Sequence, residues 1–87
     1  FEKVALLYSD KSGISMEVYT DMPGIQIYTG NFIENESGKQ GAVYQKNQGV
    51  CFETQYFPNA INVPEFEIAT VEKDKRFCSA TVFKFIL

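Results

Sequence analysis

The sequence predicts an all-β fold built from antiparallel strands, arranged as a sandwich or a barrel. Short runs rich in Val, Ile, Tyr, Phe and Thr recur along the chain, and turn-forming residues separate them. No segment repeats apolar residues at the 3.6-residue period of an amphipathic helix over a useful length. Several short strands separated by turns favour a sandwich or barrel over a parallel sheet.

The first two expected strands form a hairpin. Residues 3–9 and 15–20 are rich in Val, Leu, Tyr and Met. Between them, Asp10-Lys11-Ser12-Gly13 has the composition of a tight turn. Met22-Pro23-Gly24, where Pro and Gly are adjacent, is expected to form the next turn.

Residues 25–29 follow as a third strand with two different faces. Side chains alternate between the faces of a strand, so Gln26 and Tyr28 share one face. The two isoleucines lie on the other face. The third strand therefore has one apolar face and one face that can form hydrogen bonds.

The run 49–59 contains a single carboxylate, Glu53, in an otherwise apolar strand that ends at Pro58. Alternation places Glu53 and Gln55 on the same face. Such neighbouring polar side chains either face solvent or line a pocket for a polar ligand. The spacing alone leaves both interpretations open.

The remaining segments are loops and two further strands. Residues 34–41 are polar and contain glycine, which is typical of a surface loop, and residues 58–64 carry two prolines that interrupt regular structure. Strands are expected at 67–71 and 76–87, around a turn at 72–75.

Length and charge limit the classes of function. The chain has 87 residues and a formal net charge of −3, which fits one small domain at most. A chain of this size buries only about 60% of its unfolded surface, so folding without support would be marginal. No basic stripe is present, so nucleic acid is not an expected partner. No apolar run reaches the length of a membrane span. The chain opens directly on a strand-like run without Met, which favours a piece of a longer polypeptide.

Two cysteines, Cys51 and Cys78, lie in apolar, strand-like surroundings. We expect both to be buried free thiols, although a disulfide between them stays open. Two cysteines without histidine are too few for a zinc site, so no metal is expected. Free thiols indicate a reducing, cytoplasmic compartment.

Several ordered motifs together resemble the C-terminal part of the aldose 1-epimerases, the galactose mutarotases, and they cover nearly the whole chain. The motifs that carry this resemblance are Glu17-Val18-Tyr19-Thr20, Pro23-Gly24-Ile25-Gln26-Ile27-Tyr28-Thr29-Gly30-Asn31-Phe32, Gly41-Ala42-Val43-Tyr44, Gly49-Val50-Cys51-Phe52-Glu53-Thr54-Gln55, Phe57-Pro58-Asn59 and Thr81-Val82-Phe83-Lys84-Phe85. The resemblance implies that residues 1–87 are the C-terminal part of a single, larger antiparallel β-sandwich domain. It implies no domain boundary within the chain.

The resemblance also implies an activity, the interconversion of the α and β anomers of aldohexoses such as glucose and galactose, without a cofactor. Matched to the family motif, Glu53 is the catalytic base that removes the proton of the C1 hydroxyl, and Gln26 contacts sugar hydroxyls. In the family a histidine protonates the ring oxygen. This chain contains no histidine, so the acid and the other sugar-binding residues are expected in the remainder of a parent chain. Alone, these residues would be inactive.

Two departures from the family pattern accompany the missing histidine. Tyr56 stands where many members have His, and Val63-Pro64-Glu65-Phe66 replaces the usual Gln-Pro-Asn-Phe. The missing histidine leaves open a carbohydrate-binding β-sandwich without turnover. The small size and the many β-prone segments leave open a structural module whose sheet edges pair with another chain.

Overall fold

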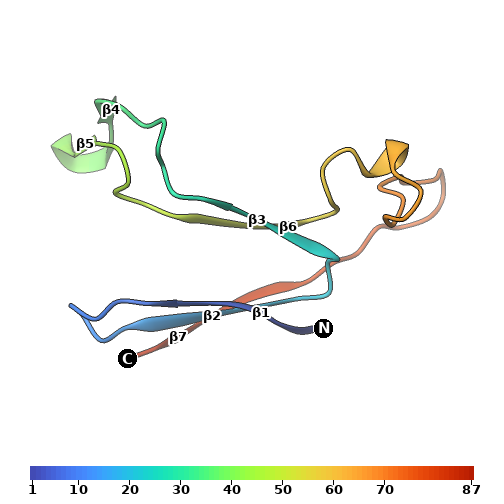
Figure 1. Ribbon diagram of the computed structural model, residues 1–87, viewed down its shortest axis with the longest axis horizontal. Coiled ribbons are helices and arrows are strands. Elements are labelled where there is room, and N and C mark those ends of the chain that lie inside the picture. Colours follow the sequence, from blue (N-terminus) through green and yellow to red (C-terminus); the bar gives the residue numbers. More distant parts are fainter.

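Seven β-strands and two short 3₁₀-helices make up the computed structural model, which describes all residues from 1 to 87 (Figure 1). The predicted all-β class is confirmed, and every strand pair is antiparallel. No helix in this structure has the length and apolarity needed to cross a membrane. In chain order the elements are β1 (Glu2–Tyr8), β2 (Ser15–Thr20), β3 (Gly24–Tyr28), β4 (Glu36–Ser37), η1 (Lys39–Gly41), β5 (Val43–Tyr44), β6 (Cys51–Gln55), η2 (Ala60–Asn62) and β7 (Thr81–Ile86).

The first sheet has the strand order β1-β2-β7 and joins the two ends of the chain. The predicted hairpin of β1 and β2 is confirmed, and β2 has the predicted bounds. In the turn, the backbone N–H of Gly13 donates to the carbonyl of Ser9 at 2.8 Å. Gly13 has φ +74°, a conformation that glycine adopts without steric cost. The last strand, β7, then pairs with the other edge of β2.

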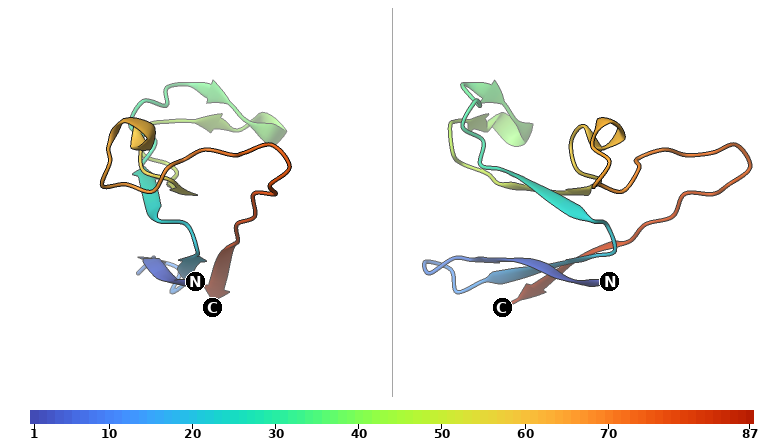
Figure 2. Two further views of the ribbon diagram at one scale, coloured as in Figure 1. Left: turned by 90° about the vertical axis from the view of Figure 1, so that its right-hand side faces the viewer. Right: turned by 45° about the vertical axis from the view of Figure 1, so that its right-hand side comes forward.

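The second sheet consists of β3 and β6, and the short pair β4–β5 lies beyond one end of it. In Figure 1 the two larger sheets form separate layers, which converge where β2 leads into β3 and spread apart from there. The side views in Figure 2 show the same open arrangement. The hairpin-like pairing of β3 with β6 leaves the loops of residues 29–50 and 56–80 at its opposite ends.

The core between these layers is small. Only four of the 87 residues are buried, among them Val18, Thr20 and Ala60. The radius of gyration is 16.5 Å, compared with about 12 Å for a compact domain of this length. Alternation along β2 places Val18 and Thr20 on the face that looks toward the β3–β6 sheet.

Large apolar side chains on these inner faces remain exposed. In the three-stranded sheet, Leu7 is 39% exposed, Phe83 46% and Phe85 65%, and in the second sheet Ile27 is 52% exposed. Soluble proteins rarely leave so much contiguous apolar surface uncovered. The inner faces of the two layers are therefore only partly covered.

On the outer face of the first sheet, Glu17 is held by three side chains. Its carboxylate lies 3.2 Å from Nζ of Lys3 and 3.9 Å from Nζ of Lys84, and it accepts a 2.7 Å hydrogen bond from the hydroxyl of Tyr19. The Tyr19 hydrogen bond, followed by the one from Lys3, lowers the pKa of Glu17 from the ordinary 4.5. The same hydrogen bond raises the pKa of Tyr19 above its ordinary value.

These shifts predict an acid-dependent loss of stability. Because the pKa of Glu17 is lower in the folded state, its carboxylate adds to the free energy of unfolding above pH 4.5. This stabilisation disappears as the pH falls through the pKa of the folded state. Urea unfolding at a series of pH values should show wild type more stable than Glu17→Gln at neutral pH, with the difference shrinking in acid. Glu36→Gln, at an exposed residue without an ion pair, serves as control. A wild-type advantage that is constant down to strong acid would contradict this prediction.

Several sequence predictions were wrong. The expected loop of residues 34–41 contains β4 and η1, because Glu36 and Ser37 pair with β5. Residues 67–71 and 76–80 do not form strands, and β7 begins only at Thr81. A strand needs a partner strand for its backbone N–H and C=O groups. In residues 67–79 the backbone hydrogen bond runs from the Lys75 N–H to the Glu72 carbonyl, within the turn expected at 72–75, and not to another strand. The cysteines are free thiols as expected, but Cys51 and Cys78 are exposed rather than buried. Cys51 lies on the outer face of β6, and Cys78 lies in the irregular segment before β7.

Candidate functional site

Gln26 and Glu53 occupy directly opposite positions in the β3–β6 ladder. Residues opposite each other in an antiparallel pair project from the same face, with Cβ atoms about 4.5 to 5.5 Å apart. The amide and the carboxylate therefore form one cross-strand pair, although Gln26 and Glu53 lie 27 positions apart in the sequence. This Gln26–Glu53 pair is the centre of the candidate site.

The face that carries the pair looks away from the three-stranded sheet. Thr54 points the opposite way from Glu53 and contacts β7, so the Glu53 face is the outer one. Both Gln26 and Glu53 are exposed, and neither side chain has a hydrogen-bond or ion-pair partner within the chain. Their polar groups are thus free to bind a ligand.

A chain of three threonine hydroxyls ties the strand of Glu53 to the first sheet. The hydroxyl of Thr20 donates to the Ala80 carbonyl at 3.0 Å, which uses its only proton. Thr81, 3.3 Å away, must then donate to Thr20, and Thr54, 2.6 Å from Thr81, must donate to Thr81. The chain of bonds is directional, and low local dielectric strengthens such chains. These hydrogen bonds hold β6 against the first sheet at Thr54, the residue next to Glu53.

One end of the pair's face is closed by aromatic rings. Gly24 lies two positions before Gln26, and a Cβ there would come within 2.9 Å of the Phe57 ring. The absence of a side chain thus lets Phe57 pack directly on β3. Phe57 in turn contacts Phe66 with ring centroids 4.7 Å apart, and this pair holds the 58–66 loop against the end of β6.

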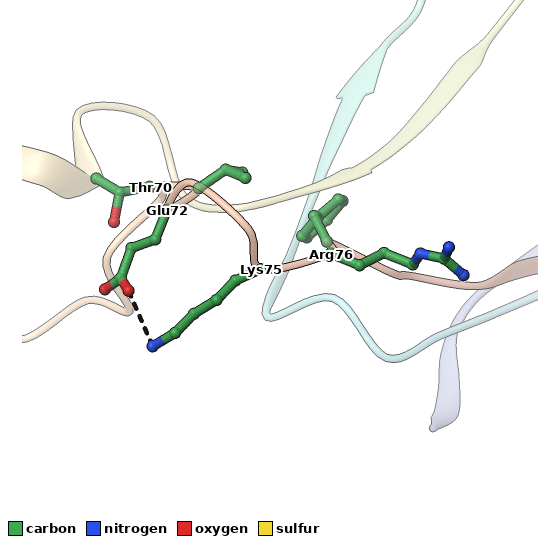
Figure 3. A pocket seen from close by; sticks show the side chains of 6 residues that line it. Thr70, Glu72, Lys75 and Arg76 are labelled. Carbon is green, nitrogen blue, oxygen red and sulfur yellow. Dashed lines mark ion pairs between the residues drawn. The ribbon is translucent and has the colours of Figure 1, made fainter.

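The surface hollows of the chain do not include Gln26 or Glu53. One of about 180 Å³ lies inside the 70–77 loop, where an ion pair of 2.9 Å joins Lys75 to Glu72 (Figure 3). Figure 3 shows the Arg76 side chain extending away from this ion pair. The other two hollows, of about 400 and 220 Å³, lie in the 31–49 loop. The pair therefore stands on an open strand surface, and walls for a closed cleft would have to come from other polypeptide.

Two features of the site could not be found by reading the sequence. Thr20, Thr54 and Thr81 appear as ordinary strand residues, and only the approach of the two sheets brings their hydroxyls together. The stacking of Phe32 on Tyr28, with centroids 6.5 Å apart, likewise depends on the path of the loop. The one sequence signal was that Tyr28 shares the face of Gln26.

Comparison with known proteins matches residues 1–84 to the family described as aldose 1-epimerase. Among curated proteins, the chain is 47% identical over 75 residues to a protein named galactose mutarotase from Mus musculus. It is 44% identical over 82 residues to the Homo sapiens protein of that name. To a Haemophilus influenzae protein named aldose 1-epimerase it is 34% identical over 82 residues.

These alignments cover most of this chain but a small part of each relative. They include 85%, 93% and 92% of the chain, in the same order, and 22%, 24% and 24% of the three relatives. The chain thus spans less than a quarter of the length of these curated proteins. Both Gln26 and Glu53 lie within the residues matched by the family.

Proposed function

Because this chain belongs to the aldose 1-epimerase family, we propose that the protein containing it interconverts the α and β anomers of aldohexoses. The observation that carries the proposal is the Gln26–Glu53 pair, an amide and a carboxylate opposite each other on one strand face. Both belong to the segment that matches the family. Glucose and galactose are the proposed substrates.

In this proposal Glu53 is the general base. Its carboxylate accepts the proton of the C1 hydroxyl as the bond between C1 and the ring oxygen breaks, and C1 becomes an aldehyde carbon. The ring oxygen receives a proton from an acid. Rotation about the C1–C2 bond followed by the reverse steps gives the other anomer. All transfers are proton transfers, so the reaction needs neither an oxidant nor a reductant.

The proposed role of Gln26 is to orient the sugar. A side-chain amide has two donor hydrogens and an acceptor oxygen, and a sugar hydroxyl both donates and accepts. With Glu53 directly opposite, the two side chains can engage adjacent hydroxyls of one pyranose. This would hold C1 within reach of the carboxylate, which is the positional requirement for a base.

The acid is proposed to come from other polypeptide. A histidine would suit this role near neutral pH, and the chain contains none. We also propose that residues 1–87 form part of one β-sandwich domain, whose remaining strands cover the inner apolar faces. The exposed side chains of Phe85 and Ile27 support this proposal, as does the small fraction of the relatives' length that the chain spans.

Polarimetry tests the activity directly. Freshly dissolved α-glucose and α-galactose should approach their equilibrium rotation faster in the presence of the longest natural polypeptide that contains this chain. Acceleration proportional to protein concentration would support the proposal. Sugar binding without acceleration would instead indicate a carbohydrate-binding sandwich without turnover.

A further inference from the structure

Gln55 is a third polar side chain on the face that carries Gln26 and Glu53. It lies two positions after Glu53 on β6, so both side chains project to the same side, with Cα atoms about 7 Å apart. The residue directly opposite Gln55 on β3 is Gly24, which has no side chain. Gln55 is half-buried, whereas Gln26 and Glu53 are exposed. The Gln55 amide has no hydrogen-bond partner within the chain, so its two donor hydrogens are free.

The ring of Phe57 occupies the space that a side chain at Gly24 would fill. A Cβ on Gly24 would lie 2.9 Å from Cε1 and 3.0 Å from Cδ1 of this ring. Because Gly24 alternates with Gln26 along β3, the direction of this Cβ is toward the face of the Gln26–Glu53 pair. The Phe57 ring therefore lies on that face, across from Gln55.

The surroundings of the Gln55 amide are apolar on one side and polar on the other. The Phe57 ring lies across the ladder from it. Glu53 is its neighbour along β6, and Gln26 is its diagonal neighbour on β3. A hydrogen bond made beside an apolar ring is less weakened by water than one on an open surface. The face thus offers a hydrogen-bond donor next to the carboxylate of Glu53.

The proposed reaction needs such a donor at O1, the oxygen of the C1 hydroxyl. When Glu53 takes the proton, the electron pair of the O–H bond stays on O1. This oxygen carries negative charge until the bond between C1 and the ring oxygen breaks and O1 becomes the aldehyde oxygen. An ionised carboxylate only accepts hydrogen bonds, so Glu53 cannot stabilise that charge itself. Donors positioned where charge develops in the transition state lower the barrier.

We propose that the side-chain amide of Gln55 donates a hydrogen bond to O1 while Glu53 removes its proton. The inference rests on the proposed function, because O1 must lie at Glu53. Side chains that start about 7 Å apart reach one oxygen when their ends lean toward each other. Gln55 keeps its protons throughout, and the electron pair of the broken ring bond passes to the ring oxygen, which the acid protonates. Gln26 remains available to orient the other hydroxyls.

Polarimetry of Gln55→Met, in the longest natural polypeptide that contains this chain, tests this role. Methionine keeps an unbranched side chain of similar length and removes both donor hydrogens. The kcat for glucose should fall about 10- to 100-fold, the worth of one hydrogen bond to a charged group. The KM should change by less than about threefold, because the bond strengthens only as O1 gains charge. Gln40→Met makes the same chemical change at an exposed residue of η1 and should keep the wild-type kcat.

A second variant and a second ligand separate this role from sugar binding in general. Gln55→Glu keeps the shape of the side chain but has no donor when ionised, so its kcat should fall at least as far as that of Gln55→Met. The compound 1,5-anhydroglucitol has the glucopyranose ring without the C1 hydroxyl. Calorimetric titration should therefore give the same Kd for it in wild type and Gln55→Met, which also shows that the variant is folded.

A wild-type kcat in Gln55→Met and Gln55→Glu would overturn the inference. An unchanged kcat with a raised KM and a raised Kd for 1,5-anhydroglucitol would also overturn it, because Gln55 would then bind a different hydroxyl. Failure of the proposed function has another signature. In that case the wild-type protein does not accelerate mutarotation at all, whichever residue stands at position 55.

Discussion

Glu53→Gln should reduce kcat for anomer interconversion by about two to four orders of magnitude, the usual contribution of a positioned acid or base. Glutamine has nearly the size of glutamate and can still hydrogen-bond a hydroxyl, but an amide does not accept the C1 proton. The KM for glucose or galactose should therefore change much less than kcat. Polarimetry at saturating sugar, with the longest natural polypeptide that contains this chain, measures the effect.

The structure provides a matched control for this substitution. Glu67→Gln removes one negative charge from an exposed position outside any strand, so it should leave kcat unchanged. Because Glu53 makes no hydrogen bond or ion pair within the chain, Glu53→Gln should also leave the unfolding transition where it is. Turnover of Glu53→Gln close to that of wild type would rule out the proposed base.

Thr20→Val should lower the free energy of unfolding by about 1 to 3 kcal/mol, the cost of leaving buried polar groups unpaired. The Thr20 residue is 1% exposed, and valine fills nearly the same volume. The change removes the hydroxyl that bonds to the Ala80 carbonyl at 3.0 Å and accepts from the Met22 N–H at 3.1 Å. It also removes the acceptor of Thr81, so the chain of hydroxyls that reaches Thr54 is broken.

Urea unfolding of the same polypeptide measures this loss, and Thr29→Val is the control. Thr29 is exposed and its hydroxyl has no partner within the chain, so its replacement should change stability by no more than about 0.5 kcal/mol. If Thr20→Val and Thr29→Val were equally stable, the hydroxyl chain would not hold the two sheets together.

The local parts of the fold could be predicted from the sequence. The hairpin around Gly13 and the bounds of β2 followed from turn residues and strand-forming residues, which act over a few positions. The predicted strand at 67–71 failed because the same local preference holds for a segment with no partner strand. Burial of Cys51 failed for a related reason, since an apolar neighbourhood in sequence does not determine whether another layer covers it.

Only part of the candidate site, too, could be predicted from the sequence. Alternation along each strand was enough to place Gln26 with Tyr28 and Glu53 with Gln55, because the direction of a side chain in a strand is set by the local backbone. Only the tertiary structure decided that Gln26 lies opposite Glu53, and that Thr20, Thr54 and Thr81 meet. The register of two strands depends on the turn geometry and on contacts between distant segments, and a shift of one residue would move Glu53 to the other face. No single stretch of sequence contains that information.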